Sequence, residues 1–458
     1  MKPHHTLLFT FAVWAAGSVC LAQLPEGSSI KLLPGEVANS SRVEITDPGD
    51  HVWTLQSSPN LATWTDVATL KVHNGHLYST VTHAPSTTQL FYRTSYATAS
   101  QSLLSSTVAT ALVLPVTPYD YTPTLPASFT VNPIAAQDNM PGTNVTTDAG
   151  AKLGRALFYD KRLSLNQTVS CASCHQQEHG FSDPEPFSRG FEGGFTGRNS
   201  MGLANSRWYQ RRRFFWDERA ATLEDQVLQP IQNAVEMGMT LPALEARLQA
   251  EPFYTDLFNE VFGSTTVTSA RISQALAQFV RSIISTQTKY DAGLAANPPF
   301  SNFTAQENQG RQIFNAPGSC SACHGTDNFV PGGGPASLFN NGLEFPYVDT
   351  GVGGVTGQPQ DMGKFKVGSL RNIELTAPYM HDGRFATLEQ VVDFYSSGVV
   401  DNPNLSPPLR LPPQQGSGVR RPNFTAAEKA ALVAFMKTLT DPALTANPQF
   451  SDPFNYGQ

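Results

Sequence analysis

One short pattern occurs twice in this chain and constrains its fold more than any other feature. Cys171-Ala-Ser-Cys174-His175 and Cys320-Ser-Ala-Cys323-His324 share the form Cys-x-x-Cys-His. The chain has five cysteines, and the fifth, Cys20, lies in an apolar stretch near the N-terminus. The two patterns therefore leave no cysteine over for a structural disulfide in the rest of the chain.

Two thiols three positions apart can form thioether bonds to the two vinyl groups of one haem, and the following histidine can then bind the iron. A zinc site would need a second Cys/His pair at short spacing, and the two patterns lie far apart. A thioredoxin-like Cys-x-x-Cys would follow a strand in a βαβ unit, which neither flank predicts. The sequence therefore favours two covalently bound haem c groups, attached through Cys171, Cys174, Cys320 and Cys323.

The N-terminus has the features of an export signal. Lys2 precedes the apolar run Leu7–Ala16, which is too short to span a bilayer as a mature helix. We expect a signal peptide over residues 1–22, cleaved after Ala22, and a periplasmic or otherwise exported protein with no membrane span. Lipidation of Cys20 and an uncleaved anchor are the alternatives.

The charge composition argues against one class of function. Lys and Arg total 30 and Asp and Glu total 37, so the formal net charge is −7. A nucleic-acid-binding protein would need a basic face, so no nucleic-acid partner is expected. The local basic run Arg211–Arg213 is a candidate haem-propionate contact or docking patch, although a solvated face is the simpler interpretation.

Three zones follow the signal peptide. Residues 38–97 contain short β-branched and aromatic runs between polar turns, which predicts a small β module. Residues 98–145 contain six prolines and are interpreted as a linker. From residue 146 onward the pattern is helical, as in Thr268–Thr286, where apolar residues recur at intervals of three and four.

Three capping boxes predict helix starts in the third zone, at Thr304–Glu307, Thr387–Gln390 and Thr425–Glu428. The proline-rich residues 399–424 are expected to form a loop. With the repeated Cys-x-x-Cys-His pattern, these features predict a mostly α fold. Two cytochrome-c-like helical haem lobes, residues 146–300 and 301–442, would follow the small all-β module.

The third zone resembles the bacterial dihaem cytochrome c peroxidase and MauG family. The segments that carry the resemblance are Leu153–Asp160, Phe215–Ala220, Pro230–Gly238, Phe365–Asn372 and Thr376–Gly383. The β module and the linker lie outside it. The resemblance implies a haem-dependent peroxidase of the cytochrome-c peroxidase type. Hydrogen peroxide would be reduced at the first haem with electrons relayed through the second.

The resemblance also implies roles for residues of the first lobe. His175 would be the proximal iron ligand, and Glu236 would act as acid and base on the distal side, with Gln226 and Pro230 at the other distal positions. A carboxylate can take a proton from the near peroxide oxygen and return it to the far one. Trp216 would lie between the haems and carry electrons. The alternatives are a solvated loop acid for Glu236 and a core aromatic for Trp216.

In the second lobe, His324 would be the proximal ligand. The distal position holds methionine in the peroxidase branch and tyrosine in MauG, and counting along from the shared motif leads to Tyr395. A packing tyrosine is the alternative, and Met380 is the nearest methionine. An anionic phenolate would stabilise higher iron oxidation states, so Tyr395 favours the MauG-like branch.

Two further expectations come from the family. The loop Phe181–Phe191 lacks the histidine that caps the first haem in the peroxidase branch, so a five-coordinate resting iron is expected. The family places one Ca²⁺ between the haems, and Asn199, Thr376 and Pro378 match its ligands, the last two through backbone carbonyls. Asn199 lies two residues farther from the tryptophan than the family pattern has it.

The expected partners are hydrogen peroxide and a small electron-donor protein, a cytochrome c or a cupredoxin. Two alternatives remain for the function. One is MauG-type oxidation of residues on a protein substrate, and the other is a non-catalytic dihaem electron carrier.

Overall fold

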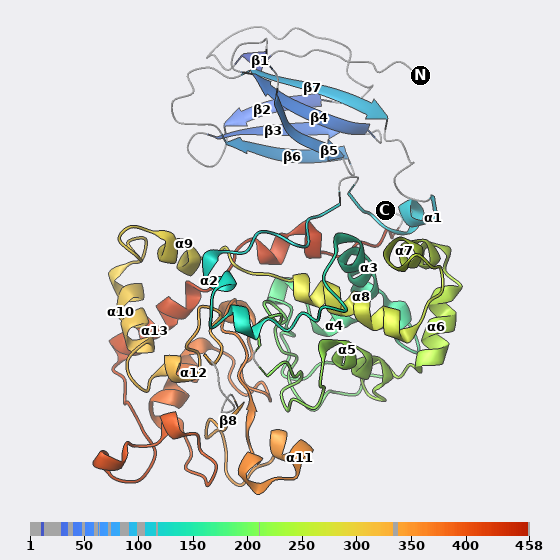
Figure 1. Cartoon of the computed structure of the whole chain (residues 1–458). Helices are drawn as coiled ribbons and strands as arrows, with labels where there is room; N and C mark the ends of the chain where they lie inside the picture. Colours follow the sequence, from blue (N-terminus) through green and yellow to red (C-terminus); the bar gives the residue numbers. More distant parts are fainter. Residues whose placement is uncertain are drawn as a thin grey trace. The chain divides into compact units, whose positions relative to one another are not determined.

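The computed structural model describes residues 11–12, 29–34, 40–47, 51–58, 63, 65–71, 75–82, 91–98, 106–115, 118–209, 211–332 and 338–456. The chain divides into two compact units, Met1–Tyr119 and Asp120–Gln458 (Figure 1). The predicted cleavage site after Ala22, and Cys20, lie outside the described residues. Among the described residues no helix is both long and apolar enough to cross a membrane.

The first unit contains two antiparallel sheets. One has the order β1-β7-β4-β5 and consists of β1 (Phe11–Ala12), β7 (Phe91–Thr98), β4 (His51–Ser58) and β5 (Thr65–Lys71). The other has the order β2-β3-β6 and consists of β2 (Ser29–Pro34), β3 (Ser40–Asp47) and β6 (Gly75–Thr82). Strands β3 to β7 occupy the region 38–97 where the β module is expected, whereas β1 and β2 lie before it, and β1 falls within the predicted signal peptide. The module as a separate domain stays a prediction. Helix α1 (Ser106–Ala111) follows them in the chain.

The second unit is mostly helical. Its helices are α2 (Ala127–Thr130), α3 (Asp148–Tyr159), α4 (Cys171–Cys174), α5 (Leu223–Gln232), α6 (Leu241–Gln249), α7 (Pro252–Phe262), α8 (Ser269–Ser282), α9 (Lys289–Ala295), α10 (Ala305–Phe314), α11 (Val352–Thr356), α12 (Leu388–Asp393) and α13 (Ala426–Lys437). A short ribbon pairs β8 (Leu338–Phe339) with β9 (Phe365–Lys366). The mostly α fold class of this part of the chain agrees with the sequence pattern.

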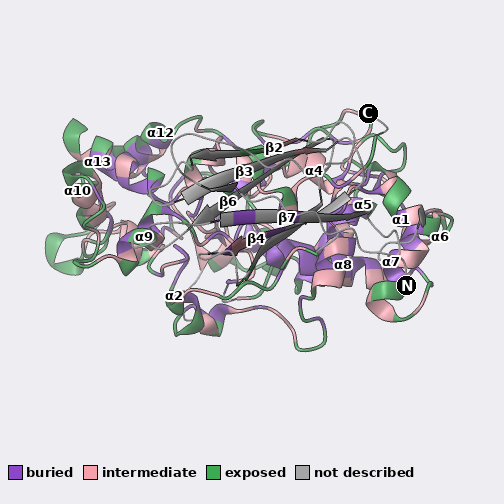
Figure 2. Cartoon of the chain, turned by 90° about the horizontal axis from the view of Figure 1, so that it is seen from above, coloured by how far each residue is buried: buried purple, intermediate pink, exposed green. Residues whose placement is uncertain are grey.

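The three predicted capping boxes are confirmed. Thr304, Thr387 and Thr425 are the N-caps of α10, α12 and α13, and each accepts a hydrogen bond from the backbone N–H three residues later. The predicted helical face over 268–286 is also confirmed as α8, which ends at Ser282 and is buried along most of its length (Figure 2). Residues 399–424 form a loop with 3₁₀ turns at Pro407–Leu409 and Pro413–Gln415, as expected.

Two helix pairs, α3 with α8 and α10 with α13, pack by the same contact. In each pair a glycine meets a backbone carbonyl of the partner helix, and a phenylalanine one turn later packs on a phenylalanine of that helix. The sets are Gly154 on Ala275 with Phe158 on Phe279, and Gly310 on Ala431 with Phe314 on Phe435. A Cβ at Gly154 would lie 2.0 Å from the carbonyl oxygen, and one at Gly310 1.9 Å, so neither approach admits a side chain.

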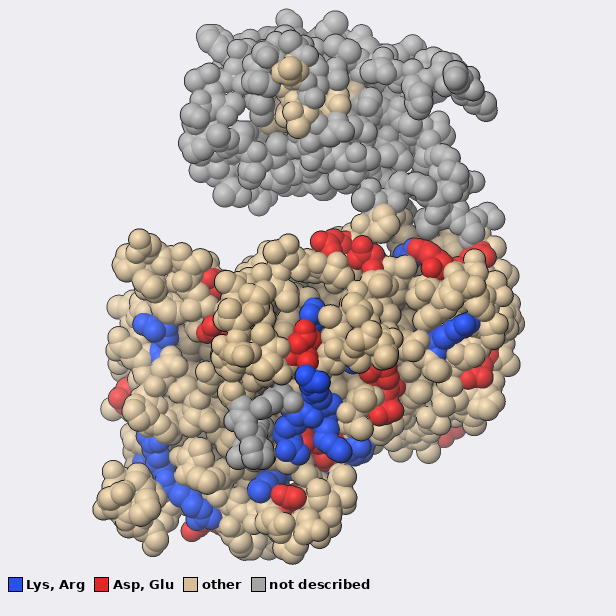
Figure 3. Space-filling view, viewed as in Figure 1, with Lys and Arg blue, Asp and Glu red and all other residues tan. Residues whose placement is uncertain are grey.

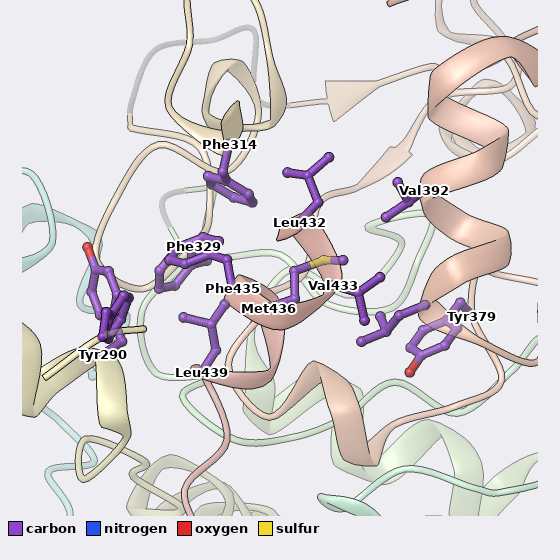
Figure 4. Packing of buried hydrophobic residues seen from close by; sticks show 12 residues of the cluster. Tyr290, Phe314, Phe329, Tyr379, Val392, Leu432, Val433, Phe435, Met436 and Leu439 are labelled. Carbon is purple, nitrogen blue, oxygen red and sulfur yellow. The ribbon is translucent and has the colours of Figure 1, made fainter. Parts of the chain in front are cut away.

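This repeat positions the two Cys-x-x-Cys-His segments, because each follows the first helix of one pair. The repeated helix-pair contact is consistent with two related lobes. The two haem lobes themselves stay a prediction. Around the second pair, Leu432, Phe435 and Met436 of α13 and Leu439 just after it belong to a core that includes Phe314 and Phe329 (Figure 4).

Part of the segment interpreted as a linker, from Asp120 onward, belongs to the second unit and contributes to its core. Phe129 and Ile134 are each 1% exposed and cluster with Trp208, whose ring lies edge-on to Phe129 at 4.7 Å between centroids. The Tyr121 hydroxyl donates to the carbonyl of Gln449 at 3.0 Å. The prolines break helical periodicity here, but the apolar residues between them still contribute to the core.

Candidate active site

The first Cys-x-x-Cys-His segment forms one helical turn, α4, which Ser170 and Ser173 cap reciprocally. Cys171 and Cys174 are free thiols. The Nδ1 atom of His175 lies 2.9 Å from the carbonyl oxygen of Phe181. Because a carbonyl only accepts, Nδ1 carries the proton and the lone pair of Nε2 is left for a metal. Burial lowers the pKa of His175, which keeps the ring neutral.

The second segment repeats this arrangement on a 3₁₀ turn, Cys320–Ala322. The Nδ1 atom of His324 lies 2.8 Å from the carbonyl oxygen of Phe329, and burial lowers the pKa of His324 to about 4. Cys320 and Cys323 are also free thiols. Each segment thus presents two unpaired thiols beside a neutral imidazole with fixed orientation. This donor set fits haem c, which the two thiols would hold covalently and to whose iron the histidine would bind.

A cavity of about 500 Å³ lies beside the first segment. The predicted residues of the first haem site all contribute to its wall: Cys171, Cys174, His175, Trp216, Gln226, Pro230 and Glu236. They come from α4, from the loop before α5, from α5 itself and from the turn after it. Among the described residues that line this cavity, His175 is the only histidine.

Glu236 is held at the cavity wall by its backbone. After α5 the Asn233 side-chain oxygen accepts from the N–H groups of Val235 at 2.8 Å and Glu236 at 3.2 Å, which turns the chain. Phe191 N–H donates to the carbonyl of Glu236 at 3.0 Å. Burial raises the pKa of the Glu236 carboxyl, and the Arg219 charge opposes that rise. A carboxyl with a raised pKa is better matched to proton exchange near neutral pH.

Trp216 borders two cavities, the one described above and a smaller one of about 100 Å³. Its indole N–H donates to the carbonyl of Asn199 at 2.8 Å, and its backbone carbonyl accepts from Lys366 N–H at 2.9 Å. The His381 ring lies 6.5 Å away between centroids, edge-on to the indole, and stacks on Phe365 at 4.0 Å. The indole is therefore fixed by hydrogen bonds and aromatic packing, as an electron-relay position requires.

Tyr395 lies beside the second pair of thiols. It belongs to a π-helical turn, Phe394–Gly398, that continues α12. Burial raises the pKa of Tyr395 to about 12, and the nearby thiols of Cys323 and Cys320 contribute to that rise. The Asn341 amide donates to the Tyr395 hydroxyl at 3.3 Å and to the Met380 sulfur at 3.5 Å. Both candidate distal ligands thus share one hydrogen-bond donor, Asn341, which no sequence pattern singled out.

The three residues expected to bind calcium meet at the smaller cavity, which Asn199, Thr376 and Pro378 help to line. The Asn199 side chain is buried, and its amide N–H donates to the carbonyl of Glu185 at 3.1 Å, which leaves the amide oxygen free to coordinate. The described residues contain no group of three or more His, Cys, Asp or Glu suited to a metal. A cation here would therefore depend on neutral oxygens, which calcium accepts.

Basic side chains gather near the middle of one face of the second unit (Figure 3). Two arginines, Arg198 and Arg211, pair with buried or half-buried acids. Arg198 donates to Asp217 at 2.6 Å and to Asp349 at 2.7 Å, and Arg211 donates to Glu218 at 2.7 Å. Sequence reasoning missed this network because the partners are not spaced in any recognisable pattern.

Comparison with known proteins agrees with this site. The family model for "Di-haem cytochrome c peroxidase" matches residues 148–298. A cytochrome-c peroxidase, IdrP2 of Denitromonas iodatirespirans, is 30% identical over 370 residues, which cover 72% of this chain and 95% of that relative. The methylamine utilization protein MauG of Methylorubrum extorquens is 34% identical over 316 residues, 68% of this chain and 83% of the relative.

A solved structure, that of a MauG-like protein associated with microbial copper homeostasis, is similar with a TM-score of 0.61 and 36% identity, covering 72% of this chain and 98% of its own. The chain belongs to the dihaem cytochrome c peroxidase and MauG family. It is accordingly a haem peroxidase, and the family implies haem cofactors. The predicted family membership is confirmed, and the roles of individual residues in this dihaem peroxidase are taken up next as proposals.

Proposed function

We propose that the chain is an exported, MauG-like dihaem peroxidase that reduces hydrogen peroxide at its first haem, with electrons relayed through the second. The observation that carries this proposal is the single cavity lined by His175, Glu236, Gln226 and Trp216. When bound, haem c supplies the iron at which the peroxide O–O bond is cleaved.

In this proposal Glu236 moves the protons. Its carboxylate takes the proton from the near oxygen of hydrogen peroxide and gives it to the far oxygen, which leaves as water. The complete reduction consumes two electrons and two protons and yields two water molecules. Gln226 lies four residues before Pro230 on α5, so both are on the same face of that helix and border the space that peroxide would occupy. The Gln226 amide can orient peroxide, and Pro230 adds no competing N–H donor.

Electrons would reach the first site through Trp216. Its indole borders both cavities and is hydrogen-bonded to Asn199, one of the three proposed calcium ligands with Thr376 and Pro378. A calcium ion at the smaller cavity would then fix the distance between Trp216 and the backbone that carries Thr376. His324 and Tyr395 would hold the second haem iron, with Met380 as the alternative to Tyr395.

A second candidate function is oxidation of residues on a partner protein, as in MauG. The observation that favours it is Tyr395, whose hydroxyl lies near the thiols of Cys320 and Cys323. A phenolate ligand stabilises oxidised iron better than a thioether does, so oxidising equivalents would persist long enough to be passed on. A plain electron carrier is less favoured, because it gives no reason for Glu236 and Gln226 to share the cavity with His175.

The test is to add hydrogen peroxide to the purified diferric protein and follow the haem spectrum by stopped flow. We expect a reaction without prior reduction. Glu236→Gln should slow it by about 10²–10⁴-fold, the usual contribution of general acid–base catalysis. Glu192→Gln is the matched control, because Glu192 is an exposed acid on a neighbouring loop.

A wild-type rate in Glu236→Gln would refute the assigned role. A reaction that appears only after reduction would favour the peroxidase branch over MauG. Reduced cytochrome c or cupredoxin that is consumed in proportion to peroxide would identify the first function.

A further inference from the structure

Tyr209 and Glu218 form a buried pair at the larger cavity that the proposed function does not use. Tyr209 lines the cavity and is 3% exposed, and Glu218 is 2% exposed. The Tyr209 hydroxyl donates a hydrogen bond to one carboxylate oxygen of Glu218. Arg211 Nε donates to the other oxygen at 2.7 Å. The carboxylate is therefore oriented with one oxygen on the phenol.

The loop that carries Glu218 is closed on itself. Phe214 N–H donates to the carbonyl of Ala220 at 3.0 Å, and Ala220 N–H donates back at 3.4 Å. Within this loop Glu218 has a φ of +55°, an uncommon value for a residue with a side chain. The loop thus fixes the backbone of Glu218, and the hydrogen bonds from Tyr209 and Arg211 fix its carboxylate.

The hydrogen-bond acceptor of an aromatic side chain determines whether one-electron oxidation leaves a radical cation or a neutral radical. A phenol that loses an electron becomes a strong acid, and a carboxylate already hydrogen-bonded to it can take the proton in the same step. Trp216 differs, because its N–H donates to a backbone carbonyl that cannot keep a proton. Oxidation of Trp216 would therefore leave a cation, whereas oxidation of Tyr209 can leave a neutral radical.

Lys366 reinforces this difference. Its Nζ lies 3.9 Å from the centroid of the Tyr209 ring and donates to the carbonyl of Arg213 at 3.1 Å. A positive charge over the ring face disfavours a second positive charge on that ring. The arrangement therefore selects loss of the electron together with the proton over loss of the electron alone.

We propose that Tyr209 is a redox-active tyrosine that gives one electron to the peroxide-oxidised haems while its phenolic proton moves to Glu218. The O–H bond of Tyr209 breaks, an O–H bond forms on Glu218, and the electron removes one of the two oxidising equivalents supplied by peroxide. An electron from a reductant reverses the step, and the proton returns to Tyr209. The inference rests on the proposed function for its oxidant.

Among the described residues, two other buried tyrosines also donate to a carboxylate and serve as references. Tyr254 donates to Asp160 at 2.7 Å and Tyr290 donates to Asp327 at 2.8 Å. Neither belongs to the wall of the larger cavity. If a carboxylate partner were sufficient for oxidation, all three tyrosines would be oxidised. If a position at the wall of the larger cavity is also required, only Tyr209 is oxidised.

The test is electron paramagnetic resonance of the dihaem protein, frozen after one equivalent of hydrogen peroxide, with the haem absorbance followed in parallel. We expect a tyrosyl signal in the wild type that narrows when the protein contains ring-deuterated tyrosine. Tyr209→Phe and Glu218→Gln should lose the signal, because one lacks the phenol and the other lacks the proton acceptor. Tyr254→Phe is the matched control and should keep it. All variants should still show the haem response.

Spin trapping followed by peptide mapping of the wild type locates the radical even if a variant fails to fold. An adduct on Tyr209 supports the proposal. An adduct on another residue, a tryptophan signal, or an unchanged signal in Glu218→Gln overturns it. A haem response to peroxide with no tyrosyl signal refutes the inference alone, whereas no haem response in the wild type refutes the proposed function and this route with it.

Discussion

The repeated helix crossing yields a prediction whose size follows from the structure. Gly310 of α10 lies against the carbonyl of Ala431 in α13, and a Cβ built on it would be 1.9 Å from that oxygen and 2.5 Å from the carbonyl carbon. Real Cβ atoms essentially never approach closer than 3.0 Å. In Gly310→Ala the two helices must therefore separate by about 1 Å, because a backbone carbonyl cannot rotate away.

Two opposing effects determine how much Gly310→Ala changes the free energy of unfolding. Separation of the helices by about 1 Å forfeits up to half of the dispersion energy of the contacts it stretches, including Phe314 on Phe435. For this loss of packing we take a destabilisation of about 3 kcal/mol, the upper end of the cost of overpacking a core. Alanine is better than glycine inside a helix by about 1 kcal/mol. The net expectation is a loss of about 2 kcal/mol in the free energy of unfolding.

The assay is urea denaturation of the haem-loaded protein, followed by circular dichroism. Gly154→Ala should behave like Gly310→Ala, because its Cβ would lie 2.0 Å from the carbonyl oxygen of Ala275. Gly142→Ala is the control, since nothing lies within 4 Å of its added Cβ, and it should change stability by less than about 0.5 kcal/mol. Stability in Gly310→Ala equal to that of the control would refute the argument that glycine is required at the crossing.

Three further predictions concern the site. Burial raises the pKa of Glu236, which must be ionised to accept a proton, so the peroxide reaction should be fastest above that pKa and slow as the pH falls through it. Arg219→Met removes the charge that opposes this rise, so the fall in rate at low pH should move to higher pH in stopped-flow measurements. If the fall stays at the same pH, a group other than Glu236 causes it. Tyr395→Phe should change the electron paramagnetic resonance spectrum of the second haem, and an unchanged spectrum would direct attention to Met380. Removal of calcium with a chelator should slow reduction of the first site by a donor; metal analysis that finds no calcium in the native protein would contradict the site at Asn199.

Local patterns predicted local structure well. The boxes at Thr304, Thr387 and Thr425 specify their helix starts through hydrogen bonds within four residues, so no distant contact is needed to interpret them. The Cys-x-x-Cys-His segments are equally local. In contrast, spacing alone said nothing about Glu236, and only the family resemblance associated it with His175 in one site.

Residues that act through long-range contacts were not predictable. Asn341 reaches Tyr395 across 54 positions, and Lys366 reaches the carbonyl of Arg213 across 153. No sequence spacing indicates the contacts of the Asn341 amide or the Lys366 ammonium, because the fold brings these groups and their partners together from distant positions. The prolines of residues 98–145 had the opposite effect: they suggested a linker, while Phe129 and Ile134 pack on Trp208.

The basic run Arg211–Arg213 shows how a surface pattern can support a buried group. Arg212 has a φ of +56° and is exposed, and its two neighbours both donate to Glu218, Arg211 to the carboxylate and Arg213 to the backbone carbonyl at 3.2 Å. The Glu218 carboxylate is one partner of Arg211 in this loop. When Glu218 receives the proton of Tyr209, its attraction to the Arg211 charge weakens, which raises the energy of the oxidised pair and favours return of the proton. The oxidised state of Tyr209 should therefore be short-lived once a reductant is present. Such a tyrosine is suited to passing electrons on rather than to storing an oxidising equivalent.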